Sequence, residues 1–179
     1  WSCQYFGYSK YHEMFSGITY AMQLDEHLAA AVQVDYIFTH LYGMYENTHF
    51  LTFEAGLIYE PVEKLSIGTH LFNPVGITGL RKKQSLPAIF RMGAGYHISD
   101  ELFVSTELEK DLKMPAQLKF GVEYKLNDLF CFRTGFSTQP IIQSFGIGYK
   151  WNHFILDISV RRHNVLGYAP QCSINYKFQ

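Results

Sequence analysis

Alternation with a period of two residues is the feature of this chain that most limits its fold. In the segment Ile141–Trp151, Phe145 and Ile147 fall on one face, and Gly146 and Gly148 fall on the other. The same alternation of large apolar residues with small or charged ones recurs in segment after segment to the end of the chain. A strand that has lipid on one side and a crowded or wet interior on the other carries this pattern. The repeat therefore predicts a transmembrane β-barrel.

Polar breaks divide the chain into about twelve such segments of about 9 to 12 residues, which is the length that crosses a bilayer. Compact and longer breaks alternate strictly, as in a barrel with short periplasmic turns and longer outer loops. With both termini on the periplasmic side, the number of strands is even. We expect an all-β, up-and-down antiparallel barrel that forms a single domain over residues 1–179. The compact breaks are Asp25–His27, Val62–Lys64, Ser99–Glu101, Asn127–Asp128 and Asn152–His153, and the longer ones are Tyr42–Asn47, Val75–Pro87, Lys110–Pro115, Thr138–Pro140 and His163–Pro170.

The composition excludes several other classes of protein. Aromatic residues make up 17% of the chain, which suits interfacial aromatic belts, and no apolar run approaches the roughly 20 residues of a membrane helix. A net charge of -1 leaves no basic stripe for nucleic acid. A soluble β-sandwich has shorter strands and could not hold so many ionised groups in a dry core. Cys3, Cys131 and Cys172 are too scattered for a disulfide framework or a zinc site, and the eight histidines lack metal-ligand spacing, so no metal or cofactor is expected.

Ionised residues of both signs fall on the inward face of the expected barrel. Adjacent strands present Glu107 and Glu109 beside Lys119, then Glu123 beside Arg133; further along, Lys150 is expected beside Asp157 and Arg161. Such a set forms either a selective pore or polar binding site, or a salt-bridge lattice that fills a narrow barrel. We favour the lattice, because opposite charges paired across strands are the ordinary solution for enclosed charges. The full set is Glu54, Arg91, Glu107, Glu109, Lys119, Glu123, Arg133, Lys150, Asp157 and Arg161.

No catalytic set is recognisable, and an enzyme is not expected. A hydrolase in a barrel wall needs a Ser and a His near a polar orienting group, and Ser16 near His12 is only a weak approach to that. The longest expected loop, Ile77–Pro87, carries Arg81, Lys82 and Lys83. These three cations either meet anionic lipopolysaccharide or a partner protein, or they form a solvated loop without a partner.

The chain contains five segments that together resemble one family of barrels: Phe53–Pro61, Ile67–Pro74, Ser105–Asp111, Phe120–Tyr124 and Val165–Pro170. They are similar to the Bacteroidetes outer-membrane barrels of the PorV/PorQ type, within the wider FadL-like group. Such barrels have about 14 strands, so the resemblance implies either two strands outside the printed sequence or a smaller relative. A signal peptide is expected to have been removed from before Trp1, because an outer-membrane protein is exported.

The resemblance implies two functions for an outer-membrane protein. PorV-like proteins hold exported cargo beside the translocon of type IX secretion, and FadL-like proteins pass hydrophobic small molecules through the barrel wall. We predict an accessory or scaffold subunit of an envelope complex, with transport of hydrophobic small molecules as the alternative. The expected partners are the lipid bilayer, lipopolysaccharide and other outer-membrane or secretion proteins.

Overall fold

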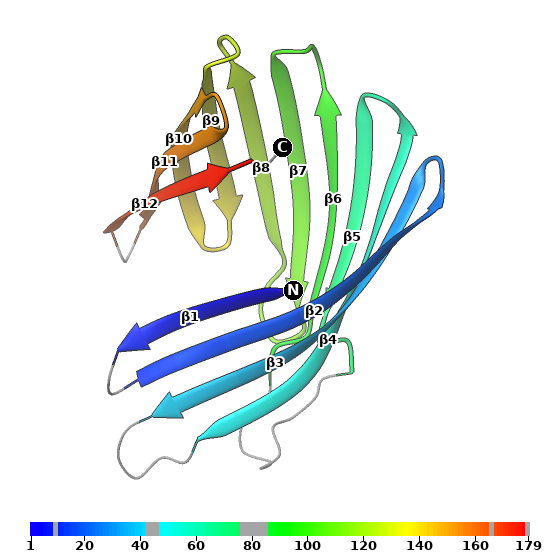
Figure 1. Ribbon diagram of the computed structural model, residues 1–179, viewed down its shortest axis with the longest axis vertical. Helices are drawn as coiled ribbons and strands as arrows, with labels where there is room; N and C mark the ends of the chain where they lie inside the picture. The colour runs from blue at the N-terminus through cyan, green and yellow to red at the C-terminus, as the bar shows by residue number, and fades with distance from the viewer. Residues whose placement is uncertain (9–10, 42–46, 76–85, 165–166, 178–179) are drawn as a thin grey trace. The chain divides into compact units, whose positions relative to one another are not determined.

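The structure is a computed structural model that describes residues 1–8, 11–41, 47–75, 86–164 and 167–177. Twelve antiparallel strands follow one another in chain order in one sheet, and the described residues contain no helix (Figure 1). The all-β, up-and-down arrangement predicted from the sequence is therefore confirmed. The strands are β1 Ser2–Tyr8, β2 Tyr11–Asp25, β3 Leu28–Leu41, β4 Thr48–Val62, β5 Leu65–Phe72, β6 Ile89–His97, β7 Leu102–Asp111, β8 Gln117–Lys125, β9 Phe130–Thr138, β10 Ile141–Trp151, β11 Phe154–His163 and β12 Gly167–Tyr176.

The described residues contain no helix that could cross a membrane.

The strand boundaries agree with the predicted turns at most positions. At the β10–β11 turn, Asn152 has a φ of 51°, a left-handed conformation that asparagine tolerates. Two predictions were wrong. The strands β2 and β4 each have 15 residues and are longer than expected. Residues Gly167–Pro170 belong to β12, where Pro170 pairs with Val160, and not to a loop. Glycine and proline read as turn signals, but a strand at the end of the strand order tolerates a residue without an N–H group.

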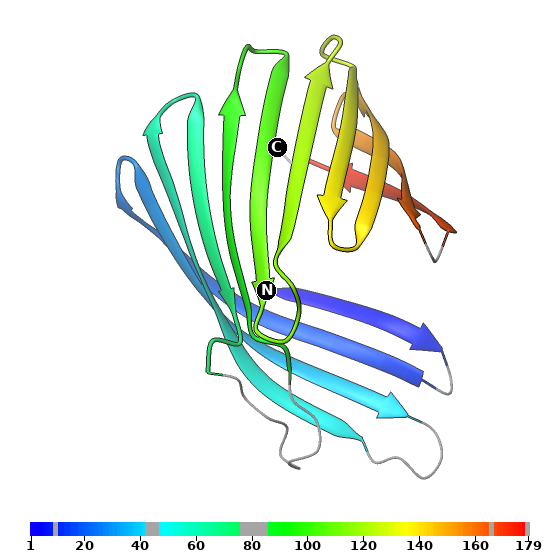
Figure 2. The same cartoon turned by 180° about the vertical axis from the view of Figure 1, so that it is seen from behind.

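Contacts between Cα atoms divide the chain into two compact units. Unit 1 contains Trp1–Tyr59, Gly68–Arg91 and Lys110–Met114, and unit 2 contains Glu60–Ile67, Met92–Glu109 and Pro115–Gln179. Within unit 2, the hairpin β9–β10 continues directly into the hairpin β11–β12 (Figures 1 and 2). The register of each pair keeps polar residues on one face of the sheet and apolar residues on the other, and we call these the polar face and the apolar face.

Burial is inverted relative to a soluble domain. Among the described apolar side chains, only Ile37 and Phe50 are buried, with 3% and 7% of their surface exposed. Large side chains along the apolar face are exposed, for example Ile18, Phe145 and Ile158. An exposed apolar surface of this extent needs a solvent other than water. A lipid-facing wall meets that need.

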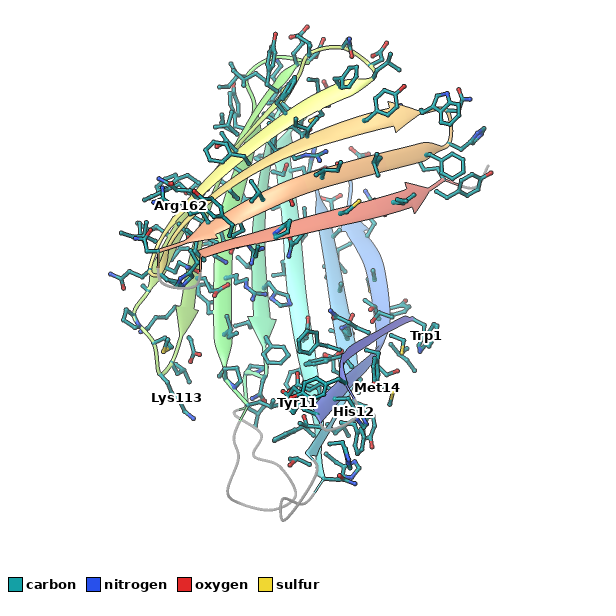
Figure 3. The ribbon with its side chains drawn as sticks, turned by 90° about the vertical axis from the view of Figure 1, so that its left-hand side faces the viewer. Trp1, Tyr11, His12, Met14, Lys113 and Arg162 are labelled. Carbon is teal, nitrogen blue, oxygen red and sulfur yellow. The ribbon has the colours of Figure 1, made fainter. Side chains whose placement is uncertain are left out.

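Aromatic and histidine rings gather where β1 and β3 end and where β2 and β4 begin. His12 stacks with Tyr5 and with His40, at ring-centroid distances of 5.6 and 4.7 Å. Phe38 contacts His49 at 5.0 Å on the same face. Figure 3 shows His12 near the start of β2. Rings with an apolar body and a polar edge are typical of the boundary between lipid and water, so this cluster marks one edge of the lipid-facing band.

Candidate functional site

Strand register brings the charged residues of unit 2 into rows across the polar face. One row contains Glu123, Arg133, Gly146, Ser159 and Gln171, each opposite the next on the adjacent strand. The next row toward the short turns contains Gly148 opposite Asp157. Two glycines of β10 thus lie between the arginine of β9 and the aspartate of β11.

Arg133 is the centre of the larger ion-pair group. Its Nε donates to Oε2 of Glu123 at 2.7 Å, and its Nη1 donates to Oδ1 of Asp157. The second contact spans β10, and it passes over Gly148: a Cβ added there would lie 2.8 Å from Oδ1 of Asp157 and 3.2 Å from Nη1 of Arg133. Because residue 148 has no side chain, the side chains of Arg133 and Asp157 can meet above it.

Lys150 was expected beside Asp157 and Arg161, and the register makes it a diagonal neighbour of Asp157 only, because Arg161 lies opposite Ser144. Lys150 lies opposite Ile155, and Asp157 lies opposite Gly148 and bonds to Arg133. A guanidinium on a long stem can reach across a strand that presents glycine, and its planar donors suit a carboxylate.

Lys119 forms a second ion-pair group. Its Nζ lies 2.8 Å from Oε1 of Glu107 and 2.8 Å from Oε2 of Glu109. Glu107 is directly opposite Lys119 in the register, whereas Glu109 is a diagonal neighbour. The structure thus brings these three residues together, and the ion pairs are partly exposed.

The remaining predicted residues are placed as follows. Arg91 lies on β6, and Glu54 lies on β4. Arg161 lies on β11 in a row with Ser144 and Ala169. The loop cations Arg81, Lys82 and Lys83 lie outside the described residues.

The polar face of unit 1 holds a cluster that the sequence reasoning did not assemble. Nε2 of His70 lies 2.8 Å from Oε2 of Glu54, and Nε2 of Gln33 donates to Oδ1 of Asp35 at 2.7 Å. Asp35 is buried, and its Oδ2 has no hydrogen-bond partner among the described residues. Gly17 provides the space, because a Cβ there would lie 2.6 Å from Oδ1 of Asp35. The sequence does hold a signal for this cluster: Gln33 and Asp35 are two polar residues on the same face of one expected strand.

Asn73 joins β4 to the segment that enters β6. Its side chain is fully buried; its Oδ1 accepts from Thr52 Oγ1 at 3.1 Å, and its Nδ2 donates to the carbonyls of Leu86 and Pro87 at 3.3 Å each. Its φ of 49° is in the left-handed region, which asparagine adopts more readily than most residues. These contacts hold residues 86–87 against the polar face.

The β6–β7 turn carries a pKa effect outside the strands that bears on stability. Ser99 Oγ donates to Oε2 of Glu101 at 2.8 Å, and this hydrogen bond, with a backbone hydrogen bond, lowers the pKa of Glu101 below its ordinary value. The charged form of Glu101 is thereby favoured at the β6–β7 turn.

Two cavities lie on opposite faces of the same strands of unit 2. The cavity on the polar face has a volume of about 410 Å³, and the groove on the apolar face has a volume of about 550 Å³. No group of three or more His, Cys, Asp or Glu residues in the described part of the chain is arranged to hold a metal ion. The three cysteines are free thiols.

Comparison with known proteins identifies the fold. No family model matches the chain, and no curated protein matches its sequence. The structure is similar to that of the Ralstonia pickettii toluene transporter TbuX, with a TM-score of 0.72 and 14% identity over 94% of this chain and 68% of that one. The Pseudomonas putida toluene transporter TodX gives a TM-score of 0.66 with 13% identity over 92% and 68% of the two chains. The KdgM porin gives 0.60 with 12% identity over 94% and 93%.

These similarities confirm the predicted fold class, a transmembrane up-and-down β-barrel of the bacterial outer-membrane kind. An outer-membrane location follows from that fold and from the exposed apolar face. The polar face is then the face toward the barrel interior. The similar structures are transporters and porins, which fits a protein that is not an enzyme.

Proposed function

We propose that this protein carries small hydrophobic molecules across the outer membrane. Two of the similar structures are toluene transporters. At 14% and 13% identity that similarity extends to the fold alone, so the proposal depends on a feature of this chain.

That feature is the groove of about 550 Å³ on the apolar face of β8 to β12. Two adjacent register rows form most of it, and nearly all of their side chains are aliphatic or aromatic; Arg133, Gly146 and Ser159 complete the lining. Pockets for small ligands are typically about 300–1,000 Å³ and mainly apolar. Since this face meets lipid, the groove offers a hydrophobic molecule a place to lodge in the wall. The rows are Val122, Thr134, Phe145, Val160 and Pro170, and then Tyr124, Phe132, Ile147 and Ile158.

Uptake of radiolabelled toluene by cells that express the full chain tests the proposal. Ile147→Trp places a large ring in the groove, whereas Ile18→Trp places the same ring on the exposed apolar face of β2, outside the groove. We expect uptake several-fold above that of cells without the protein, lost in the first variant and retained in the second. Uptake at the background level with the unaltered protein, or equal uptake by both variants, would contradict the proposal.

A second candidate is an accessory subunit of an envelope complex, as in the PorV/PorQ-like barrels. The observation that favours it is the charge network around Lys119 and Arg133, because side chains that fill a barrel interior oppose free diffusion. Such a subunit would co-purify from solubilised outer membranes with envelope proteins in fixed ratio, and it would be silent in planar bilayers. A barrel that purifies alone and carries toluene would exclude this role.

A further inference from the structure

The cavity of about 410 Å³ on the polar face of unit 2 has the composition of a binding site for a polar ligand. Serine hydroxyls line it from three strands, at Ser105, Ser144 and Ser159, and Gln171 adds an amide. Hydroxyl and amide groups at these positions can donate to a bound oxygen atom. Its volume is within the range that encloses a small molecule.

Glycine residues create the space in this cavity. Gly121 and Gly135 lie opposite each other, and Ser144 follows on β10. A Cβ at Gly121 would lie 2.7 Å from Ser105 Oγ, and one at Gly135 would lie 2.7 Å from Ser144 Oγ. The two hydroxyls therefore lean over the glycines, and any larger residue would displace them.

The two arginines that line the cavity, Arg133 and Arg161, differ in their acidic partners. Arg133 is engaged by both Glu123 and Asp157. Arg161 also lines the cavity and is exposed, and no described acidic side chain lies within ion-pair distance of its guanidinium. Its row partners Ser144 and Ala169 are neutral. Arg161 is thus the cation of the cavity lining that can receive an anion from outside the protein.

We infer that this cavity binds a small organic carboxylate, with Arg161 as the charged anchor and the hydroxyls of Ser144 and Ser105 as further donors. A guanidinium presents paired N–H groups that match the two oxygens of a carboxylate. Phe103 lines the same cavity and supplies an aromatic surface for the organic part of the ligand. This site lies on the face opposite the apolar groove, and it does not depend on the proposed transport of hydrophobic molecules.

Isothermal titration of the full chain in a non-ionic detergent tests the inference, with benzoate as the probe and benzamide as its uncharged analogue. We expect benzoate to bind and benzamide to bind far more weakly. The variant Arg161→Gln should weaken benzoate binding by about ten- to a hundred-fold, the size expected for the loss of a charge-assisted contact. Arg162→Gln is the matched control, because Arg162 is the next residue of β11 and its side chain therefore lies on the opposite face of the sheet.

Three results would overturn the inference: no binding of benzoate at millimolar concentration, equal binding of benzamide, or equal effects of Arg161→Gln and Arg162→Gln. If Arg161→Gln does not fold, Ser144→Val provides the second readout, since it removes a hydroxyl and narrows the cavity without removing a charge. It should weaken benzoate binding, and unchanged binding would also overturn the inference. Loss of toluene uptake with intact benzoate binding would contradict the proposed function and leave the carboxylate site standing.

Discussion

Replacing Gly148 by alanine should separate the ion pair of Arg133 and Asp157 with one methyl group. The added Cβ would lie 2.8 Å from Oδ1 of Asp157 and 3.2 Å from Nη1 of Arg133, so both side-chain ends must shift. The backbone itself accepts alanine, because Gly148 is not among the glycines with positive φ. The structure offers a matched control in Gly68, where the nearest atom to an added Cβ is the carbonyl oxygen of Leu57 at 3.9 Å.

Two opposing terms decide the size of the effect. Alanine in a strand is favoured over glycine by about 0.5–1 kcal/mol, because less backbone entropy is lost on folding. A hydrogen bond between charged groups contributes about 1.5–3 kcal/mol in a dry site. Arg133 and Asp157 have 43% and 26% of their side chains exposed, so solvent screening reduces this to about 1 kcal/mol. Gly68→Ala should therefore stabilise the protein by about 0.5–1 kcal/mol, and Gly148→Ala should be about 1 kcal/mol less stable than that control.

Urea unfolding of the barrel in detergent, with linear extrapolation, measures this difference. In an Arg133→Gln background the two alanine variants should become equal, because no ion pair remains to be displaced. At about 1 M salt the difference should also shrink, since the screening length falls to about 3 Å. If Gly148→Ala and Gly68→Ala are equally stable when Arg133 is present, the missing side chain at Gly148 is not what allows the ion pair of Arg133 and Asp157.

Four other outcomes follow from named contacts. Arg133→Ala should lower the thermal midpoint in detergent without opening a conductance in planar bilayers, and an unchanged midpoint would count against a stabilising charge network. Asn73→Ala should cost about 2–4 kcal/mol in urea unfolding, because it leaves Thr52 and two carbonyls without a partner and removes a residue suited to positive φ. Because the folded-state pKa of Glu101 is lowered, its stabilising effect should be present above the ordinary glutamate pKa and lost as the pH falls through the lowered value. The difference in free energy of unfolding between the wild type and Glu101→Gln should therefore vanish in acid. Asp35→Asn should be neutral or stabilising in urea unfolding, since Oδ2 of Asp35 is buried with no hydrogen-bond partner in the described part of the chain.

The strand pattern and the turns could be predicted from the sequence because both are local. Period-two alternation in β10 decides which side chains meet lipid, and compact polar breaks such as Asn152–His153 decide where a strand reverses. The β12 boundary was missed because Gly167 and Pro170 have the same local signal in a turn and in a strand at the end of the strand order.

The partners within the polar face could be predicted only in part. Glu123 and Arg133 lie on consecutive strands joined by a short turn, so their pairing follows from that turn. The pairing of Arg133 with Asp157 depends on two successive registers and on the length of the arginine side chain. The burial of Asn73 depends on a distant segment, residues 86–87, that no pattern near Asn73 indicates.

Glycine has no side chain, and on the polar face of unit 2 this has two consequences. Where an arginine lies beside it, as at Gly148, the missing side chain lets an ion pair close across a strand. Where the described part of the chain offers no acidic partner, as for Arg161 near Gly121 and Gly135, the missing side chains leave a cavity with an available cation. The first arrangement places an ion pair across the polar face, and the second supplies the anion site proposed for Arg161. The positions of carboxylates relative to glycine, and not the number of charges, therefore decide which parts of this interior are structural and which can bind a ligand.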